Sequence, residues 1–197
     1  MKESISVELA EREFGITSPH ERMDNGELRF RLLCEDGNGY VRTLATSFGG
    51  WQNSHSHSAF REFYLIELGW IAFATPGSDA RPIVQIFHPG DIYISPLGEV
   101  HNVYLAADSV MHTIRLGIRG VQPLWESAAW FDAQTQHLTE AEIFVLAGVN
   151  KNGPPSNPMG NTPVPLGILA SWVTIFEEFE ETIAIETTRL RSLWTRP

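Results

Sequence analysis

Two histidines and a glutamate lie close together in the sequence of this 197-residue chain. His55 and His57 are two residues apart, and in a β-strand such residues point to the same face of the sheet. Glu62 follows five residues after His57. If the chain turns at 58–59 and re-enters a strand at Phe60, the Glu62 carboxylate meets the two imidazole rings. This spacing predicts three metal ligands from one hairpin.

A fourth ligand candidate is His101, which follows a turn-forming segment at 96–98. Strand alternation places its ring on one face with Val103 and Leu105. Three neutral imidazoles and one carboxylate leave a divalent ion with a net positive charge, and six-coordinate geometry leaves two positions open for water, substrate or dioxygen. We therefore predict one divalent ion, and mixed nitrogen and oxygen ligation allows Fe, Mn, Ni, Zn or Co. A His-x-His pair alone is more often a surface feature, so the prediction depends on all four residues.

Catalytic candidates follow from the same alternation. His112 shares its parity with the apolar residues of 110–116, so we expect it to point inward, as a proton shuttle, a partner of a ligand, or a hydrogen-bonded core histidine. Tyr64 shares its parity with Glu62 and is expected to offer its hydroxyl to a ligand or to Glu62, with core packing as the alternative. Glu67 has the opposite parity and is expected at the sheet surface. Glu62, Tyr64 and His112 are therefore the candidates for moving protons.

The elements that position these residues are predicted to be short antiparallel strands. Segments rich in β-forming residues alternate with Gly, Pro, Asn and Asp turns, which is typical of a barrel or sandwich. The expected strands are residues 28–33, 40–47, 63–75, 83–88, 91–95, 101–105 and 109–117. The sequence EDGNG at 35–39 predicts a hairpin between the first two. The chain is thus divided into an N-terminal extension (1–27), a β-barrel (28–120) and a C-terminal helical extension (121–197).

The C-terminal extension has helical signals. Thr139 followed by acidic residues predicts the start of a short helix that ends near Gly148. Residues 150–165 hold five of the twelve prolines and are expected to form a loop. From 166 to 194, apolar residues recur at three- and four-residue steps, which predicts an amphipathic helix that packs on the barrel or on a second subunit.

The ligand candidates and the glycines around them resemble the two motifs of the cupin superfamily. The first motif, G-x5-H-x-H-x4-E-x6-G, is similar to the pattern of Gly49, His55, His57, Glu62 and Gly69. The second, G-x5-P-x-G-x2-H-x3-N, is similar to Gly90, Pro96, Gly98 and His101, with Leu105 in place of the final Asn. That Asn is not a ligand. The resemblance covers about residues 44–117 and implies an all-β fold, a jelly-roll β-barrel (double-stranded β-helix) with the metal inside and added C-terminal helices.

The resemblance also implies a choice of activities. The favoured one is oxidation by dioxygen of a chelating substrate such as an enediol, β-diketone or α-hydroxy acid, as in the quercetinase-like and acireductone dioxygenase-like members. The alternatives are isomerisation, epimerisation or lyase action on a sugar or keto acid, with the ion as a Lewis acid, and a non-enzymatic cupin that only holds a ligand. Fold and motif alone do not establish a reaction.

The composition of the chain argues against some classes of binding partner. The formal net charge of −10 opposes binding to nucleic acid or to an anionic membrane surface. The N-terminus lacks the apolar stretch of a secretory signal, and segment 63–75 is shorter than the roughly 20 residues of a membrane-spanning helix. One cysteine, Cys34, excludes an internal disulfide. We expect a cytoplasmic protein with a small-molecule substrate, associated as a homodimer through its terminal extensions, as is common among cupins.

Overall fold

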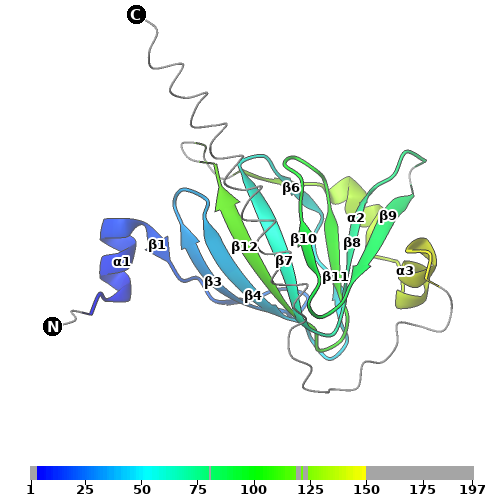
Figure 1. Cartoon of the computed structure of the whole chain (residues 1–197), viewed down its shortest axis with the longest axis horizontal. Helices are drawn as coiled ribbons and strands as arrows, with labels where there is room; N and C mark the ends of the chain where they lie inside the picture. The colour runs from blue at the N-terminus through cyan, green and yellow to red at the C-terminus, as the bar shows by residue number, and fades with distance from the viewer. Residues whose placement is uncertain (1–3, 80, 119–120, 122–123, 150–197) are drawn as a thin grey trace, which may run out of the picture. The chain divides into compact units, whose positions relative to one another are not determined.

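A computed structural model describes residues 4–79, 81–118, 121 and 124–149 of the chain. This part contains thirteen strands and three helices. The strands form a larger sheet, a four-stranded sheet and a two-stranded ribbon, all antiparallel (Figure 1). The predicted all-β fold is confirmed.

The larger sheet is built around the predicted hairpin at 35–39. Its order is β1-β3-β4-β12-β7-β10, with β2 paired to β3. The strands are β1 (Ile16–Thr17), β2 (Glu21–Arg22), β3 (Leu28–Cys34), β4 (Gly39–Leu44), β7 (Phe60–Leu68), β10 (Ile92–Ile94) and β12 (Val110–Gly117). Because β12 lies between β4 and β7, the sheet joins segments that are far apart in the sequence.

The four-stranded sheet has the order β5-β11-β8-β9. Its strands are β5 (Gly50–Trp51), β8 (Ile71–Pro76), β9 (Pro82–Phe87) and β11 (Asn102–Leu105). The prediction of one strand over 63–75 is wrong, since β7 ends at Leu68 and β8 begins the other sheet at Ile71. The break lies at Gly69, whose φ of +75° suits glycine and where a Cβ would stand 2.2 Å from the Ser109 hydroxyl oxygen.

The barrel core lies between the two sheets. Strand β8 is buried on both faces, because helices cover its outer side. Its residues Ile71 and Phe73 point inward, whereas Ala72 and Ala74 belong to a second cluster, the outer cluster. The outer cluster consists of Trp51, Ala72, Ala74, Val84, Tyr104, Ala106, Ala128, Phe131 and Ile143. The inner cluster consists of Tyr64, Ile66, Ile71, Phe73, Val103, Leu105 and Met111. Leu105, which replaces the final Asn of the second motif, is completely buried there.

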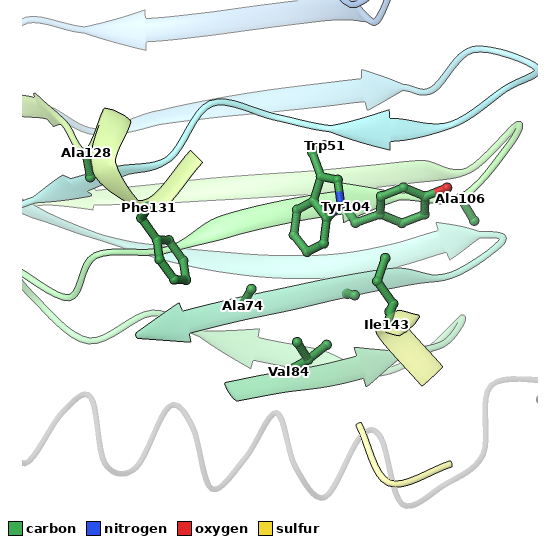
Figure 2. Close-up of a cluster of buried hydrophobic side chains, with 9 residues drawn as sticks. Trp51, Ala74, Val84, Tyr104, Ala106, Ala128, Phe131 and Ile143 are labelled. Atoms are coloured by element: carbon green, nitrogen blue, oxygen red, sulfur yellow. The ribbon is translucent and has the colours of Figure 1, made fainter. Parts of the chain in front are cut away.

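Two short helices pack on the outer face of the four-stranded sheet. Helix α3 (Glu140–Leu146) begins with the predicted Thr139 cap, which forms a capping box with Glu142, and this confirms the predicted helix. Helix α2 (Ala129–Thr135) was not expected from the sequence. Figure 2 shows Phe131 of α2 and Ile143 of α3 in the outer cluster with Trp51 and Tyr104 of the sheet.

Pairing extends across both predicted domain boundaries, which themselves stay predictions. Strands β1 and β2 precede residue 28 and pair with β3, and β13 (Trp125–Ser127) follows residue 120 and pairs with β6 (His55–His57). Helix α1 (Val7–Phe14) precedes them, capped by Ser6. The predicted loop at 150–165 and helix at 166–194 lie outside the described residues, and the homodimer stays a prediction. No helix in the part that the structure describes is long and apolar enough to span a bilayer.

Candidate metal centre

The four predicted ligands come together at one place. His55 and His57 lie on β6, Glu62 is the third residue of β7, and His101 directly precedes β11. One nitrogen or oxygen atom from each lies within 4.8 Å of those of the other three. His57, Glu62 and His101 are buried, and His55 is half-buried. The predicted ligand set is therefore present as a cluster.

Backbone pairing brings the two motifs into contact. The amide of His55 donates to the carbonyl of His101 at 3.0 Å, and the amide of His101 donates back at 2.9 Å. This isolated bridge joins residues from opposite ends of the motif region and holds their ring centroids 4.6 Å apart. The rings of His55 and His57 are also 4.6 Å apart, centroid to centroid.

The prediction that three ligands come from one hairpin is wrong, because β6 pairs with β13 whereas β7 pairs with β10 and β12. The turn at 96–98 and the residue before it instead hold β6 and β7 in place. The Ser95 amide donates to the Glu62 carbonyl at 2.9 Å, and the Glu62 amide donates to the Ser95 hydroxyl at 3.2 Å. The Gly98 amide donates to the His57 carbonyl at 2.7 Å. The second motif thus holds two ligands of the first by their backbones.

Two imidazoles are oriented for metal binding through Nε2. Nδ1 of His55 lies 2.7 Å from the Asn53 carbonyl, and Nδ1 of His101 lies 2.9 Å from the Glu99 carbonyl. A carbonyl oxygen only accepts, so each ring carries its proton on Nδ1 and keeps the Nε2 lone pair for an ion. His57 differs, because its Nε2 is 2.9 Å from Oε2 of Glu62 and its buried Nδ1 has no partner among the described residues.

Burial keeps these imidazoles uncharged. It lowers the pKa of His55 to about 3, and the neighbouring imidazoles of His101 and His57 contribute to the shift. Burial likewise lowers the pKa of His101 to about 4, against the opposing effects of the Glu99 carbonyl and Glu62. A metal ligand must be a neutral imidazole, so both rings have the required form at neutral pH.

The two oxygens of Glu62 have different surroundings. Oε1 accepts from Nε of Arg115 at 2.8 Å, whereas Oε2 faces His57 and accepts from the Tyr64 hydroxyl. Burial alone raises the pKa of Glu62, but the interaction with His57, the charge of Arg115 and the hydrogen bond from Tyr64 outweigh it and lower the pKa below its usual range. Glu62 is therefore an ionised candidate ligand with Oε2 toward the imidazoles.

The cluster has the size and chemistry of a metal site. Nitrogen and oxygen ligands lie about 2.0–2.2 Å from a first-row divalent ion, so opposite ligands are separated by roughly 4.4 Å or less. The largest separation of 4.8 Å needs only a small contraction to meet that limit. Three neutral nitrogen donors and one carboxylate suit Fe, Mn, Ni, Zn or Co, and the residues thus fit a divalent ion.

Tyr64 lies in the interior as predicted. Its hydroxyl donates to Oε2 of Glu62 and lies 3.3 Å from Nε2 of His101. Burial and the adjacent Glu62 carboxylate raise the pKa of Tyr64 well above its usual value. The phenol therefore stays protonated beside the ligand cluster.

The predicted inward orientation of His112 is wrong. His112 shares one face with Ile114 and Leu116, as alternation predicts, but this is the outer face, because Met111, Thr113 and Arg115 line the pocket on the inner face. His112 lies on the outer face of the sheet, where Nδ1 is 2.7 Å from the Tyr40 hydroxyl and Nε2 is 2.7 Å from Glu67. It is not among the residues of the pocket, so His112 is no longer a catalytic candidate. Glu67 lies at the surface as expected.

A pocket adjoins the ligand cluster on the inner face of the larger sheet. Its lining residues are Arg29, Arg31, Val41, Thr43, Gln52, His55, Glu62, Tyr64, Met111, Thr113, Arg115 and Trp125. The arginines carry no motif signal in the sequence, although Arg29 and Arg31 alternate with apolar Phe30 as inner and outer residues of one strand. The sequence did not predict Trp125 as a pocket residue, because strand β13 was not expected.

Helix α2 supports the ligands from outside the barrel. Oδ1 of Asp132 accepts from the Ser54 amide at 2.7 Å, next to His55. Asn102, next to His101, donates from its side chain to the Thr135 hydroxyl at 2.8 Å. The helix thus holds both sides of the bridge between the two motifs.

Comparisons with known proteins give distant structural similarities. No protein-family model matches the chain, and no curated protein matches its sequence. A Klebsiella pneumoniae conserved protein with a double-stranded β-helix domain is 16% identical, with 55% of this chain and 90% of that chain covered and a TM-score of 0.43. KdgF from Halomonas sp. is 16% identical over 52% of this chain and 88% of that chain, with a TM-score of 0.42.

An oxalate decarboxylase from Bacillus subtilis is 14% identical over 67% of this chain, with a TM-score of 0.45. The match spans 35% of the decarboxylase chain. The fold itself follows from the strand order of the two sheets and from the convergence of both sequence motifs on one buried cluster.

Proposed function

We propose that this chain is a cupin enzyme, a metal-dependent dioxygenase of a small chelating substrate. The observation that carries the proposal is the cluster of His55, His57, Glu62 and His101 beside a pocket. These four residues would hold a divalent ion, with the pocket beside it open to the substrate. The ion would supply Lewis-acid and redox chemistry.

The chain's own residues would bind the substrate and handle its proton. An enediol or β-diketone must lose a proton to become an electron-rich chelating anion. Oε2 of Glu62 is a proton acceptor within the cluster, and the hydroxyl of Tyr64 is a proton donor that is hydrogen-bonded to it. We assign them to the transfer of that proton and to the orientation of the bound anion.

The reaction balances without another reductant. Cleavage of a β-diketone or enediol by dioxygen breaks one carbon–carbon bond and the O–O bond. One oxygen atom enters each of the two carbonyl-containing products, and the substrate supplies all the electrons that dioxygen accepts. The pocket therefore needs only the substrate and dioxygen.

Metal content is the first test. We expect the purified wild-type protein to hold about one divalent ion per chain by elemental analysis, as four convergent ligands imply. The His57→Ala variant should lose most of it. His112→Ala is the matched control, because His112 lies on the outer face and its loss should leave metal content unchanged. Equal metal content in wild type and His57→Ala would refute the metal site.

Oxygen uptake is the second test. The protein loaded with Fe, Mn, Ni or Co should consume oxygen with a panel of β-diketones, enediols and α-hydroxy acids, and His57→Ala should not. Turnover of a sugar or keto acid without oxygen uptake would instead assign the site to isomerisation or lyase chemistry. Ligand binding that is unchanged after metal removal would assign it to binding alone.

A further inference from the structure

We propose that the substrate of this site is a small organic anion, with a carboxylate that Arg31 and Arg115 bind in the pocket while its other end reaches the metal ligands. The inference deepens the proposed function and rests on it only for the statement that the bound anion reacts. Three arginines and one acidic residue, Glu62, line the pocket. The whole chain has a net charge of −10, so the positive charge of the pocket is opposite in sign to the charge of the protein as a whole.

Arg29 is fixed by other residues. Its Nε and one terminal nitrogen donate to Oε2 of Glu27 at 3.2 and 2.9 Å. Glu27 is 3% exposed, and the same oxygen accepts from the side chain of Gln52 at 3.1 Å. Because a buried carboxylate already neutralises its charge, Arg29 forms part of the wall and is not the group that binds an anion.

Arg31 has weaker partners than Arg29. Its side chain is only 12% exposed, but its acidic partner Glu21 is 55% exposed. Its other contacts, to the Pro19 carbonyl at 3.4 Å and the Met23 sulfur at 3.5 Å, are long and weak. An ion pair with a solvated carboxylate adds little stability, so a ligand carboxylate inside the pocket can replace Glu21 at small cost. Arg31 therefore supplies a largely buried guanidinium that is able to exchange its partner.

Arg115 connects the anion site to the metal ligands. It lines the pocket and donates to Glu62 through Nε alone, and neither terminal nitrogen has a partner in the described part of the chain. Its guanidinium carbon lies 5.1 Å from the centre of the Phe60 ring, which fixes its plane. Paired N–H groups of a guanidinium match the two oxygens of a carboxylate.

The size of the cavity sets the size of the anion. The cavity volume is about 60 Å³. So small a cavity limits the anion to a few carbon atoms, such as a three-carbon acid. The hydroxyl-bearing Thr43 and Thr113 also line it and suit the polar groups of such a molecule.

The test compares malonate with malonamide, its uncharged analogue, by isothermal titration calorimetry on the Mn²⁺-loaded protein. We expect malonate to bind at least about tenfold more tightly, since a charge-assisted hydrogen bond is lost with the amide. Arg31→Gln should weaken malonate binding by about tenfold while Mn²⁺ content stays the same. Arg31→Lys keeps the positive charge, so its affinity for malonate should lie between those of the wild type and Arg31→Gln.

Arg81→Gln is the matched control, because Arg81 carries the same charge but its side chain is 80% exposed and is not part of the pocket. It should bind malonate as wild type does. The inference is overturned if malonate binds no better than malonamide or if a folded Arg31→Gln binds malonate like wild type. The same wild-type comparison on the metal-free protein, where malonate has no Mn²⁺ to chelate, tests the arginines even if Arg31→Gln folds poorly.

Failure of the proposed function is a separate result. A protein that binds no Mn²⁺ refutes the metal enzyme, yet the arginines remain in the metal-free pocket. Preference for malonate over malonamide in that protein, lost in Arg31→Gln, would support the anion site alone. Binding of Mn²⁺ without any preference for malonate would keep the metal site and refute the anion site.

Discussion

Arg115 binds one oxygen of the Glu62 carboxylate and leaves the other oxygen facing the imidazoles. The hydrogen bond from Nε of Arg115 occupies Oε1 at 2.8 Å, so Oε2 is the oxygen that faces the imidazoles. The two residues are paired across β12 and β7, from segments 53 residues apart. A guanidinium on the neighbouring strand therefore fixes the orientation of a candidate metal ligand.

Substitution of Arg115 by Met should weaken metal binding. The change leaves Oε1 of the buried Glu62 without its charged partner and allows the carboxylate to rotate. Loss of such an orienting contact lowers metal affinity by about 10–100-fold. The measurement is competition with a chelator of known affinity, and Arg81→Gln serves as the control for charge. An affinity equal to that of wild type would show that Arg115 does not orient Glu62.

Substitution of Tyr64 by Phe should separate turnover from metal binding. The ring still fills the inner core, but Glu62 loses the hydroxyl that donates to Oε2. With saturating metal, we expect a fall in kcat of about 100-fold or more, as for the loss of a group that positions a proton, and an altered pH profile. Substrate KM should change much less. A normal kcat would restrict Tyr64 to core packing.

The metal-free protein should lose stability as the pH falls below 6.5. The pKa of His55 is about 3 and that of His101 about 4 in the folded chain, against an ordinary 6.5. The unfolded chain therefore binds protons in a range where the folded chain does not, and the free energy of unfolding decreases toward acid pH. Above 6.5 both rings are neutral in both states and this contribution is constant.

Urea unfolding at about pH 7.5 and about pH 5.5 measures this effect, which we expect to be on the order of 1 kcal/mol per histidine. His101→Asn should reduce the difference, and His88→Asn, outside the cluster, should not. A free energy of unfolding that is equal at the two pH values in the metal-free protein would contradict the buried neutral histidines.

Truncation of Phe131 should destabilise the barrel, although the residue follows the predicted barrel boundary at 120. Phe131 is completely buried in the outer cluster, so Phe131→Ala should cost about 3–5 kcal/mol in the free energy of unfolding. The neighbouring Trp130 is 55% exposed and provides the control, with an expected change for Trp130→Ala of about 0.5 kcal/mol or less. Equal effects of the two changes would mean that α2 does not belong to the barrel.

Local sequence patterns were sufficient for the ligand cluster. The His-x-His spacing and strand alternation predicted the two imidazoles of β6, and the turn at 96–98 predicted the start of the strand that follows His101. The Thr139 capping signal predicted α3. These features depend on neighbours a few residues away, so the sequence contains the information needed to predict them.

The failures have non-local causes. The prediction for His112 assumed that the face with apolar Ile114 and Leu116 points inward, whereas the inner face of this strand borders a polar pocket formed with distant strands. The break at Gly69 depends on Ser109, which packs where a side chain would be. Helix α2 has no side-chain cap at Ala128 and is held by contacts with Ser54 and Asn102.

The sequence by itself determined which residues form the candidate metal cluster and the strand periodicity that turns the two imidazoles of β6 to one face. Only the tertiary structure decided that Arg31, Arg115 and Trp125 share a pocket with them. The physical reason is that alternation has a period of two and is local, whereas the face on which a side chain finally lies depends on register with distant strands. A polar pocket inside a barrel also reverses the usual rule that apolar residues point inward.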